Sequence, residues 1–139
     1  LLSGAKPEVV EVLTKFGEKI GVAFQVADDL LDVASNETAS GKTPGTDLKE
    51  GIPTLVTLYV IAANETADKD LIAKLRGPIS DQDLPDVISK LRTHNAVKEV
   101  QAYLAQVAKE ANDLLVDLPE GAAKEGLKNL TYALVNRST

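Results

Sequence analysis

The stretch that decides the fold of this chain is Gly21–Gly51, GVAFQVADDLLDVASNETASGKTPGTDLKEG. Its first part is an apolar helical segment that carries three aspartates, Asp28, Asp29 and Asp32, and its second part is rich in glycine and polar residues. Successive helical residues turn by about 100°, so Gln25, Asp28 and Asp32 share one stripe of the helix and Asp29 flanks it.

These aspartates oppose folding unless something binds them. Like charges at i,i+4 cost roughly 0.2–0.5 kcal/mol, and an anion near a helix C-terminus costs roughly 0.3–1 kcal/mol more. The apolar flanks predict burial, where unpaired carboxylates are costlier still. A divalent cation removes the conflict, and Mg²⁺ is typically held by one or two carboxylates plus substrate phosphates. The alternative is a solvated helix edge, which the apolar flanks and the following loop disfavour.

Composition excludes several classes of protein. The net charge of -6 comes without a basic block, which argues against nucleic acid as a partner. The longest apolar run, Leu55–Ala63, is too short to span a bilayer, and the chain carries no secretory signal and no cysteine. We therefore expect a soluble, cytoplasmic protein without disulfides or thiolate metal sites.

The 139 residues suffice for one hydrophobic core. The sequence contains no methionine, and Leu1–Ala5 is typical of the end of a preceding helix followed by a glycine stop. We therefore expect residues 1–139 to be the C-terminal portion of a single domain in a larger protein.

Helical periodicity runs through the chain and no β-alternation interrupts it, so the fold class is predicted to be all-α, with about six helices. Residues 36–51 are predicted to form a loop, and a loop of that length in a compact domain tends to be functional. The helices are expected over 7–35, 54–64, 67–76, a segment entered through Ser80-x-x-Asp83 and Pro85, a long segment from Asn95, and 121–136.

Three further features carry predictions of their own. Gly17 and Gly21 each weaken a helix, so they are expected to allow close approach by another helix or by a ligand. A second acidic cluster, Asp81, Asp83 and Asp86, lies at a helix start and is interpreted as capping rather than metal binding. His94 is the only histidine, and the sequence identifies no catalytic partner for it.

The types of residue present exclude several classes of enzyme reaction. Acyl transfer lacks its nucleophile and base, and a glycosidase would separate its two carboxylates instead of clustering three within a turn. Clustered carboxylates followed by a lysine, Lys42, fit the binding of a magnesium diphosphate.

The same residues resemble a known family. Gly21-Val22-Ala23-Phe24-Gln25, then Asp28-Asp29-Leu30-Leu31-Asp32, then Gly41-Lys42 through Asp47 are similar to the second aspartate-rich region of trans-isoprenyl diphosphate synthases. The resemblance covers residues 1 to about 54 and is strongest to bacterial long-chain polyprenyl diphosphate synthases. It implies part of an isoprenoid-synthase helical bundle.

What the resemblance implies for the metal is specific. In such enzymes an allylic diphosphate ionises with loss of Mg²⁺-bound pyrophosphate, and the carbocation alkylates isopentenyl diphosphate. Carried over, Asp28, Asp29 and Asp32 form the metal site, with Asp28 and Asp32 as direct ligands and Asp29 in support. Asp28, Asp29 and Lys42 form the catalytic set.

The resemblance also implies a substrate site and an assembly. Lys42 is expected to contact the diphosphate, Phe24 and Gln25 to line the pocket near the isoprenoid, Asp47 to order the loop, and Arg137 to lie near isopentenyl diphosphate. The full-length protein is expected to be a homodimer or a heteromer.

Two departures from the family pattern matter. Many members carry a second lysine shortly after the loop, where this chain has Ile52 in Gly51-Ile52-Pro53-Thr54. The first aspartate-rich motif is absent, so residues 1–139 are predicted to be inactive alone. Two alternatives remain open: a non-catalytic or half-site helical subunit of a heteromeric synthase, and another all-α magnesium enzyme such as a terpene cyclase.

Overall fold

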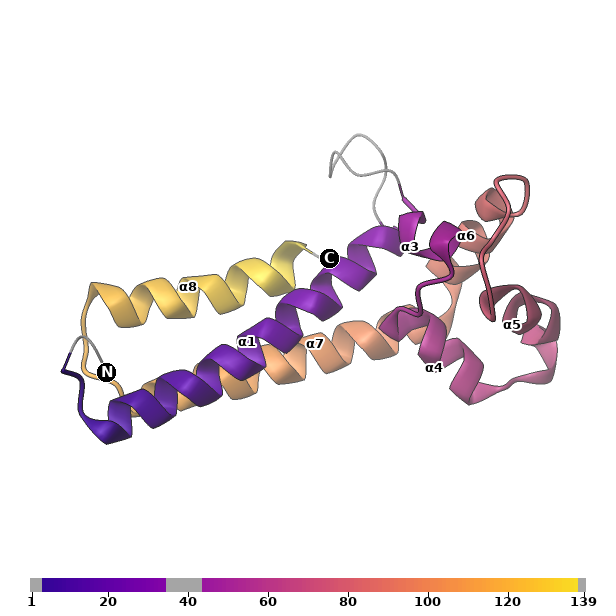
Figure 1. Cartoon of the computed structure of the whole chain (residues 1–139). Helices are drawn as coiled ribbons and strands as arrows, with labels where there is room; N and C mark the ends of the chain where they lie inside the picture. The colour runs from indigo at the N-terminus through magenta and orange to yellow at the C-terminus, as the bar shows by residue number, and fades with distance from the viewer. Residues whose placement is uncertain (1–3, 35–43, 138–139) are drawn as a thin grey trace. The chain divides into compact units, whose positions relative to one another are not determined.

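The computed structural model describes residues 4–34 and 44–137, and these residues form helices without a β-strand (Figure 1). The all-α prediction is therefore confirmed. The α-helices are α1 (Pro7–Ala34), α3 (Thr46–Glu50), α4 (Leu55–Ala63), α5 (Lys69–Leu75), α6 (Leu84–Thr93), α7 (Asn95–Leu114) and α8 (Ala122–Arg137), with two 3₁₀ turns, η1 (Thr66–Asp68) and η2 (Leu115–Asp117). Within the described ranges, no helix is both long and apolar enough to cross a bilayer.

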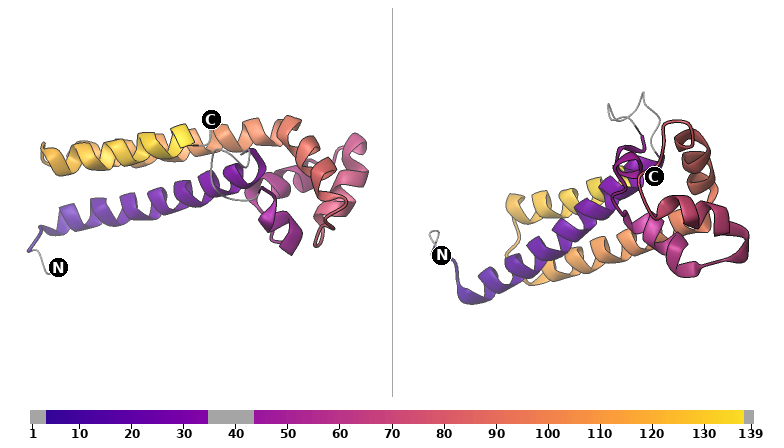
Figure 2. Two further views of the ribbon diagram at one scale, coloured as in Figure 1. Left: turned by 90° about the horizontal axis from the view of Figure 1, so that it is seen from above. Right: turned by 45° about the vertical axis from the view of Figure 1, so that its right-hand side comes forward.

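The chain divides into two compact units, and both α1 and α7 contribute to each of them. The first unit comprises residues 4–27 and 103–137. In it, α7 runs opposite to α1, and α8 turns back after η2 (Figures 1 and 2). Phe16 of α1 packs with Ala111, Leu115 and Leu118, and this cluster is the core of the unit.

The second unit comprises residues 28–102, namely the last turns of α1, the helices α3 to α6 and the start of α7. Helix α4 begins at a capping box in which the Thr54 hydroxyl accepts the Thr57 N–H, while the Thr57 hydroxyl accepts the Thr54 N–H. The side chains that carry the core are fully buried: Leu30, Val33, Val56, Val60, Val87, Leu91 and Val100.

One prediction about the elements needs correction, and two helices expose more apolar surface than their composition suggests. The loop expected over 36–51 contains the short helix α3. Gly45 is the N-cap residue of this helix, and the Asp32 carboxylate accepts the N–H of its first residue, Thr46. Helix α4 is apolar along most of its length, yet its Leu58 is 47% exposed. In α8, Leu130 is 44% exposed, since the unit buries only one side of that helix.

Candidate active site

The three aspartates of the DDxxD run lie on the last turns of α1 and are not a solvated edge. Asp29 and Asp32 are buried, with 9% and 8% of their surface exposed, and Asp28 is half-buried. Two buried carboxylates so close in sequence require strong polar partners.

Asp29 is held by the start of another helix. Its Oδ2 accepts the backbone N–H of Leu55, the first residue of α4, at 2.7 Å. A carboxylate at a helix N-terminus is favourable because the first N–H groups of the helix have no partner within it. Asp29 therefore fixes α4 to the aspartate-bearing end of α1.

Asp32 makes the corresponding contact to α3, but only through one oxygen. Its Oδ1 accepts the Thr46 N–H at 3.1 Å, whereas the buried Oδ2 has no hydrogen-bond partner among the described residues. Burial raises the pKa of the Asp32 carboxyl, and the nearby Asp47 carboxylate raises it further, against the opposing effect of the backbone N–H groups at 45–47. Among the described residues, this buried acceptor oxygen therefore receives no hydrogen bond.

The turn before α3 depends on glycine. Gly45 adopts φ 81°, donates its N–H to the Asp32 carbonyl at 2.9 Å, and caps α3. A Cβ added there would lie 2.7 Å from Ile88 Cδ1 and 2.9 Å from Leu84 Cδ1. Both the left-handed backbone and the close packing therefore demand glycine.

One residue that supports the site has no signal in the sequence. Arg92 of α6 donates from Nε to the Val33 carbonyl at 2.9 Å, which satisfies an acceptor in the last turn of α1. The two residues are 59 positions apart. Only the tertiary structure brings Arg92 to the aspartate-bearing helix end.

The remaining predicted residues are distributed as follows. Phe24 and Gln25 are exposed on α1 one turn before Asp28, and Asp47 is half-buried in α3. Lys42 lies outside the described residues, and so does the side chain of Arg137, whose backbone ends α8. Ile52 is 46% exposed.

The structure does not bring the aspartates together as a three-ligand cluster. Within residues 4–34 and 44–137, no group of three His, Cys, Asp or Glu side chains is arranged to hold a metal ion. The donor set nevertheless suits Mg²⁺, which needs only one or two carboxylates when phosphates supply the other ligands. The observation that supports a cation here is the buried Oδ2 of Asp32, which has no hydrogen-bond partner among the described residues.

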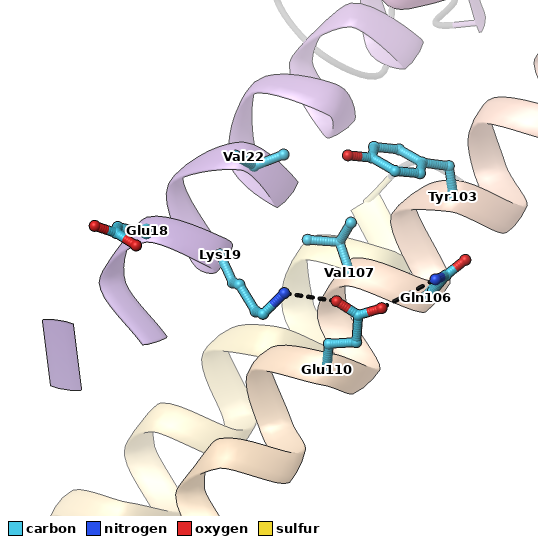
Figure 3. A pocket seen from close by; sticks show the side chains of 7 residues that line it. All are labelled: Glu18, Lys19, Val22, Tyr103, Gln106, Val107 and Glu110. Atoms are coloured by element: carbon cyan, nitrogen blue, oxygen red, sulfur yellow. Dashed lines mark hydrogen bonds and ion pairs between the residues drawn. The ribbon is translucent and has the colours of Figure 1, made fainter. Parts of the chain in front are cut away.

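A hollow between α1 and α7 in the first unit contains none of the predicted site residues (Figure 3). Two of its ionic groups are bound to each other: Lys19 Nζ donates to Glu110 at 2.6 Å, and Gln106 donates to the same carboxylate at 2.9 Å. The rest of its lining comprises Glu18, Val22, Tyr103 and Val107.

The second acidic cluster lies at the start of α6, but the capping interpretation is wrong for Asp83, the N-cap residue, whose side chain makes no capping hydrogen bond. Asp83 accepts from Ser80 and from Lys74, at 2.8 and 2.6 Å, and Asp86 accepts from Lys90 at 2.8 Å. The hydrogen bonds to Lys74 and Ser80 lower the pKa of the Asp83 carboxyl.

His94 has a partner that the sequence did not reveal. Its Nε2 lies 3.1 Å from Asp68 Oδ2, and its Nδ1 accepts the Ala96 N–H at 3.0 Å. The ring therefore caps the start of α7, where Nδ1 must be unprotonated and Nε2 carries the hydrogen towards Asp68.

Comparison with known proteins identifies the family to which the chain belongs. The family model described as polyprenyl synthetase matches residues 1–91. The chain is 36% identical over 138 residues to nonaprenyl diphosphate synthase of Mycobacterium tuberculosis, covering 99% of this chain and 41% of that protein. It is 33% identical over 138 residues to heptaprenyl diphosphate synthase component 2 of Geobacillus stearothermophilus, covering 99% of this chain and 42% of that protein.

A solved structure agrees in fold. The geranylgeranyl pyrophosphate synthase of Corynebacterium glutamicum, crystallised with calcium and isoprenyl diphosphate, matches with a TM-score of 0.87 and 34% identity, over 97% of this chain and 42% of that one. The chain thus spans about two fifths of the length of the relatives it matches. The family model and the fold together show that this chain belongs to the polyprenyl synthetase family.

Proposed function

We propose that the intact protein is a trans-prenyltransferase that makes a polyprenyl diphosphate by Mg²⁺-dependent condensation of an allylic diphosphate with isopentenyl diphosphate. The observation that carries this proposal is the buried Asp32 carboxylate, one oxygen of which has no hydrogen-bond partner among the described residues, one helical turn after the half-buried Asp28. Such a pair suits a cation shared with a substrate phosphate.

The aspartates and Lys42 would have different roles in this reaction. Asp28 and the free oxygen of Asp32 would hold Mg²⁺, while Asp29 anchors α4 and so keeps the end of α1 in place. Bound Mg²⁺ would neutralise charge on the diphosphate and favour its departure. Lys42 would add a second positive charge on the diphosphate, as the family resemblance implies.

The reaction balances without a nucleophilic side chain. The allylic C–O bond breaks, and pyrophosphate leaves with the electron pair. The double bond of isopentenyl diphosphate then attacks the allylic cation, and loss of one proton regenerates a double bond. Phe24 and Gln25 lie one turn before Asp28 on α1 and would contact the allylic group. In the intact protein Arg137 would bind isopentenyl diphosphate, and Asp47 would order the turn into α3.

The test is the Asp28→Asn variant of the intact protein, assayed for condensation of isopentenyl diphosphate with an allylic primer. Losing a metal ligand should lower kcat by on the order of 10²-fold and raise the Mg²⁺ concentration needed for half-maximal rate. Asp113→Asn is the matched control, since Asp113 is an exposed residue paired with Lys109 at 2.6 Å. Equal rates in Asp28→Asn and the wild type would refute the metal role.

A second proposal concerns assembly. The similarity to a protein named as component 2 of a heptaprenyl synthase favours a heteromeric partner as an alternative to a homodimer. Size-exclusion chromatography with light scattering on the intact protein, alone and co-expressed with candidate partners, separates the two. An active homo-oligomer would exclude the need for a second component.

A further inference from the structure

The last turn of α1, which carries Asp32, is held by contacts from distant parts of the second unit. A carbonyl in the last turn of a helix lacks an N–H partner within the helix, and another group has to bind it. In α1 the Asp32 carbonyl accepts the Gly45 N–H at 2.9 Å, and the Val33 carbonyl accepts Arg92 Nε–H, also at 2.9 Å. The order of this turn therefore depends on tertiary contacts.

Arg92 suits this position in charge as well as in reach. The C-terminal end of a helix carries a partial negative charge, and Asp28, Asp29 and Asp32 add to it. Helix α1 has no basic residue in its own last turn, so a cation that offsets this charge has to come from another element. Arg92 of α6 supplies one, and a hydrogen bond donated by a guanidinium is stronger than one donated by a neutral group.

The position of Arg92 is fixed at the junction of α6 and α7. Leu91, the residue before it, is fully buried, and its carbonyl accepts the backbone N–H of His94, which ends α6, at 3.0 Å. The His94 ring is bound on both sides: Nδ1 accepts the Ala96 N–H at 3.0 Å, and Nε2 lies 3.1 Å from Asp68 Oδ2. Arg92 thus extends from a helix end that is held to η1 through Asp68.

We propose that Arg92 is a positioning residue for the metal site. By holding the Val33 carbonyl it keeps Asp32, the preceding residue, in the orientation that binds Mg²⁺ together with the diphosphate. The contact between Asp68 and His94 keeps Arg92 within reach of α1. The inference rests on the proposed function. Because Arg92 acts through the backbone of α1, its loss should weaken the binding of metal and diphosphate without removing a ligand.

The first test measures the Mg²⁺ dependence of the intact protein. We expect Arg92→Ala to raise the Mg²⁺ concentration needed for half-maximal rate by on the order of 10-fold, the lower end of the effect of residues that orient metal ligands. Arg92→Lys should restore most of the loss, because a lysine ammonium also donates to carbonyls at a helix end. Arg76→Ala is the matched control, since Arg76 is an exposed arginine at the end of α5, and it should behave as the wild type.

The second test needs no catalysis. Hydrogen exchange of the ligand-free intact protein, followed by mass spectrometry, reports local opening of a helix end. Arg92→Ala should exchange faster than the wild type in a peptide that covers residues 28–34, whereas peptides of α8 should be unchanged. The rise in Tm caused by Mg²⁺ with pyrophosphate should also be smaller in this variant. If Arg92→Ala does not fold, Arg92→Gln replaces it, because an amide donates without charge, and the same two shifts are expected.

Asp68→Ala tests the supporting contact. Alone it should raise the Mg²⁺ requirement by less than Arg92→Ala does. Combined with Arg92→Ala it should add nothing, because both changes act through the same hydrogen bond to Val33. Additive effects would overturn the assignment of the contact between Asp68 and His94 to this role.

Two results would overturn the positioning role while leaving the proposed function standing. One is wild-type Mg²⁺ dependence and wild-type exchange in folded Arg92→Ala. The other is a lowered Tm with unchanged Mg²⁺ dependence, which would show a merely structural contact. A wild type that makes no prenyl product would instead overturn the proposed function, and exchange over residues 28–34 would still decide whether Arg92 holds the end of α1.

Discussion

At the scale of single residues, the aspartates of one motif differ in what they do. Asp29 is a buried carboxylate whose Oδ2 caps α4, whereas Asp32 caps α3 with one oxygen, and its other oxygen receives no hydrogen bond from the part of the chain that the structure describes. Sequence spacing places both on one helix end, but it does not say which oxygen meets which N–H. The residue of the site whose burial is least compensated is therefore Asp32.

The pH dependence of stability follows from the burial of Asp32. Because burial and then Asp47 raise the pKa of Asp32, the folded state binds its proton more tightly than the unfolded chain does. Stability from this group is therefore fully present below the unfolded value of about 3.9 and declines as pH rises through the higher folded-state pKa.

Asp32→Asn should remove this decline. An amide keeps an acceptor for the Thr46 N–H and carries no charge, so we expect the free energy of unfolding at pH 7 to rise by about 1 kcal/mol. The gain should vanish well below the unfolded pKa of about 3.9, where the wild-type carboxyl is neutral in both states. Urea unfolding of the intact protein at the two pH values measures this, with Asp113→Asn as control. Destabilisation at pH 7 would mean that Oδ2 has a partner in solution.

At the scale of elements, side chains close the junctions between helices. His94 caps the start of α7, Thr54 caps the start of α4, and Lys124 of α8 binds the 3₁₀ turn η2 that precedes α8. Lys124 is a buried lysine, 5% exposed, whose Nζ donates to the Val116 and Leu118 carbonyls at 3.0 Å each and to Glu120 at 2.7 Å. Its three donors are all used, so the cation is paired as a buried charge must be.

Lys124→Met should destabilise this junction. The methionine fills similar volume but leaves two carbonyls without their donor, which costs about 1–3 kcal/mol of unfolding free energy. Lys128→Met is the control, because Lys128 pairs at 2.8 Å with Glu125, whose side chain is 58% exposed, and such pairs contribute ~0–1 kcal/mol. Denaturant midpoints of the two variants provide the measurement. Equal midpoints would contradict a structural role for Lys124.

At the scale of the whole molecule, metal and diphosphate should bind together. The described residues contain no ready three-ligand cluster, so Mg²⁺ alone should bind weakly, whereas Mg²⁺ with pyrophosphate completes the coordination. A ligand at 100 times its Kd stabilises the folded state by about 2.7 kcal/mol. We expect the Tm of the intact protein to rise with both together and to change little with either alone. A full rise with Mg²⁺ alone would contradict this.

The sequence by itself determined the helical class, the bounds of α1 to within one residue, and the position of the aspartates on its final turns. It could do so because apolar periodicity, caps and helical spacing are local properties of the chain. The assignment of Asp81, Asp83 and Asp86 to a helix start was likewise readable from Ser80 and Pro85. The family resemblance rested on the same local pattern, and the comparisons confirm it.

Only the tertiary structure decided which groups meet. The Asp29 contact to Leu55, the Arg92 contact to Val33 and the His94 contact to Asp68 join residues that are 26, 59 and 26 positions apart. Periodicity says which side of a helix is apolar, but the direction from which another helix arrives depends on packing. For the same reason the exposure of Leu58 and Leu130 and the short helix α3 could not be read in advance. Local order follows from the chain, and the chemistry of the site follows from distant contacts.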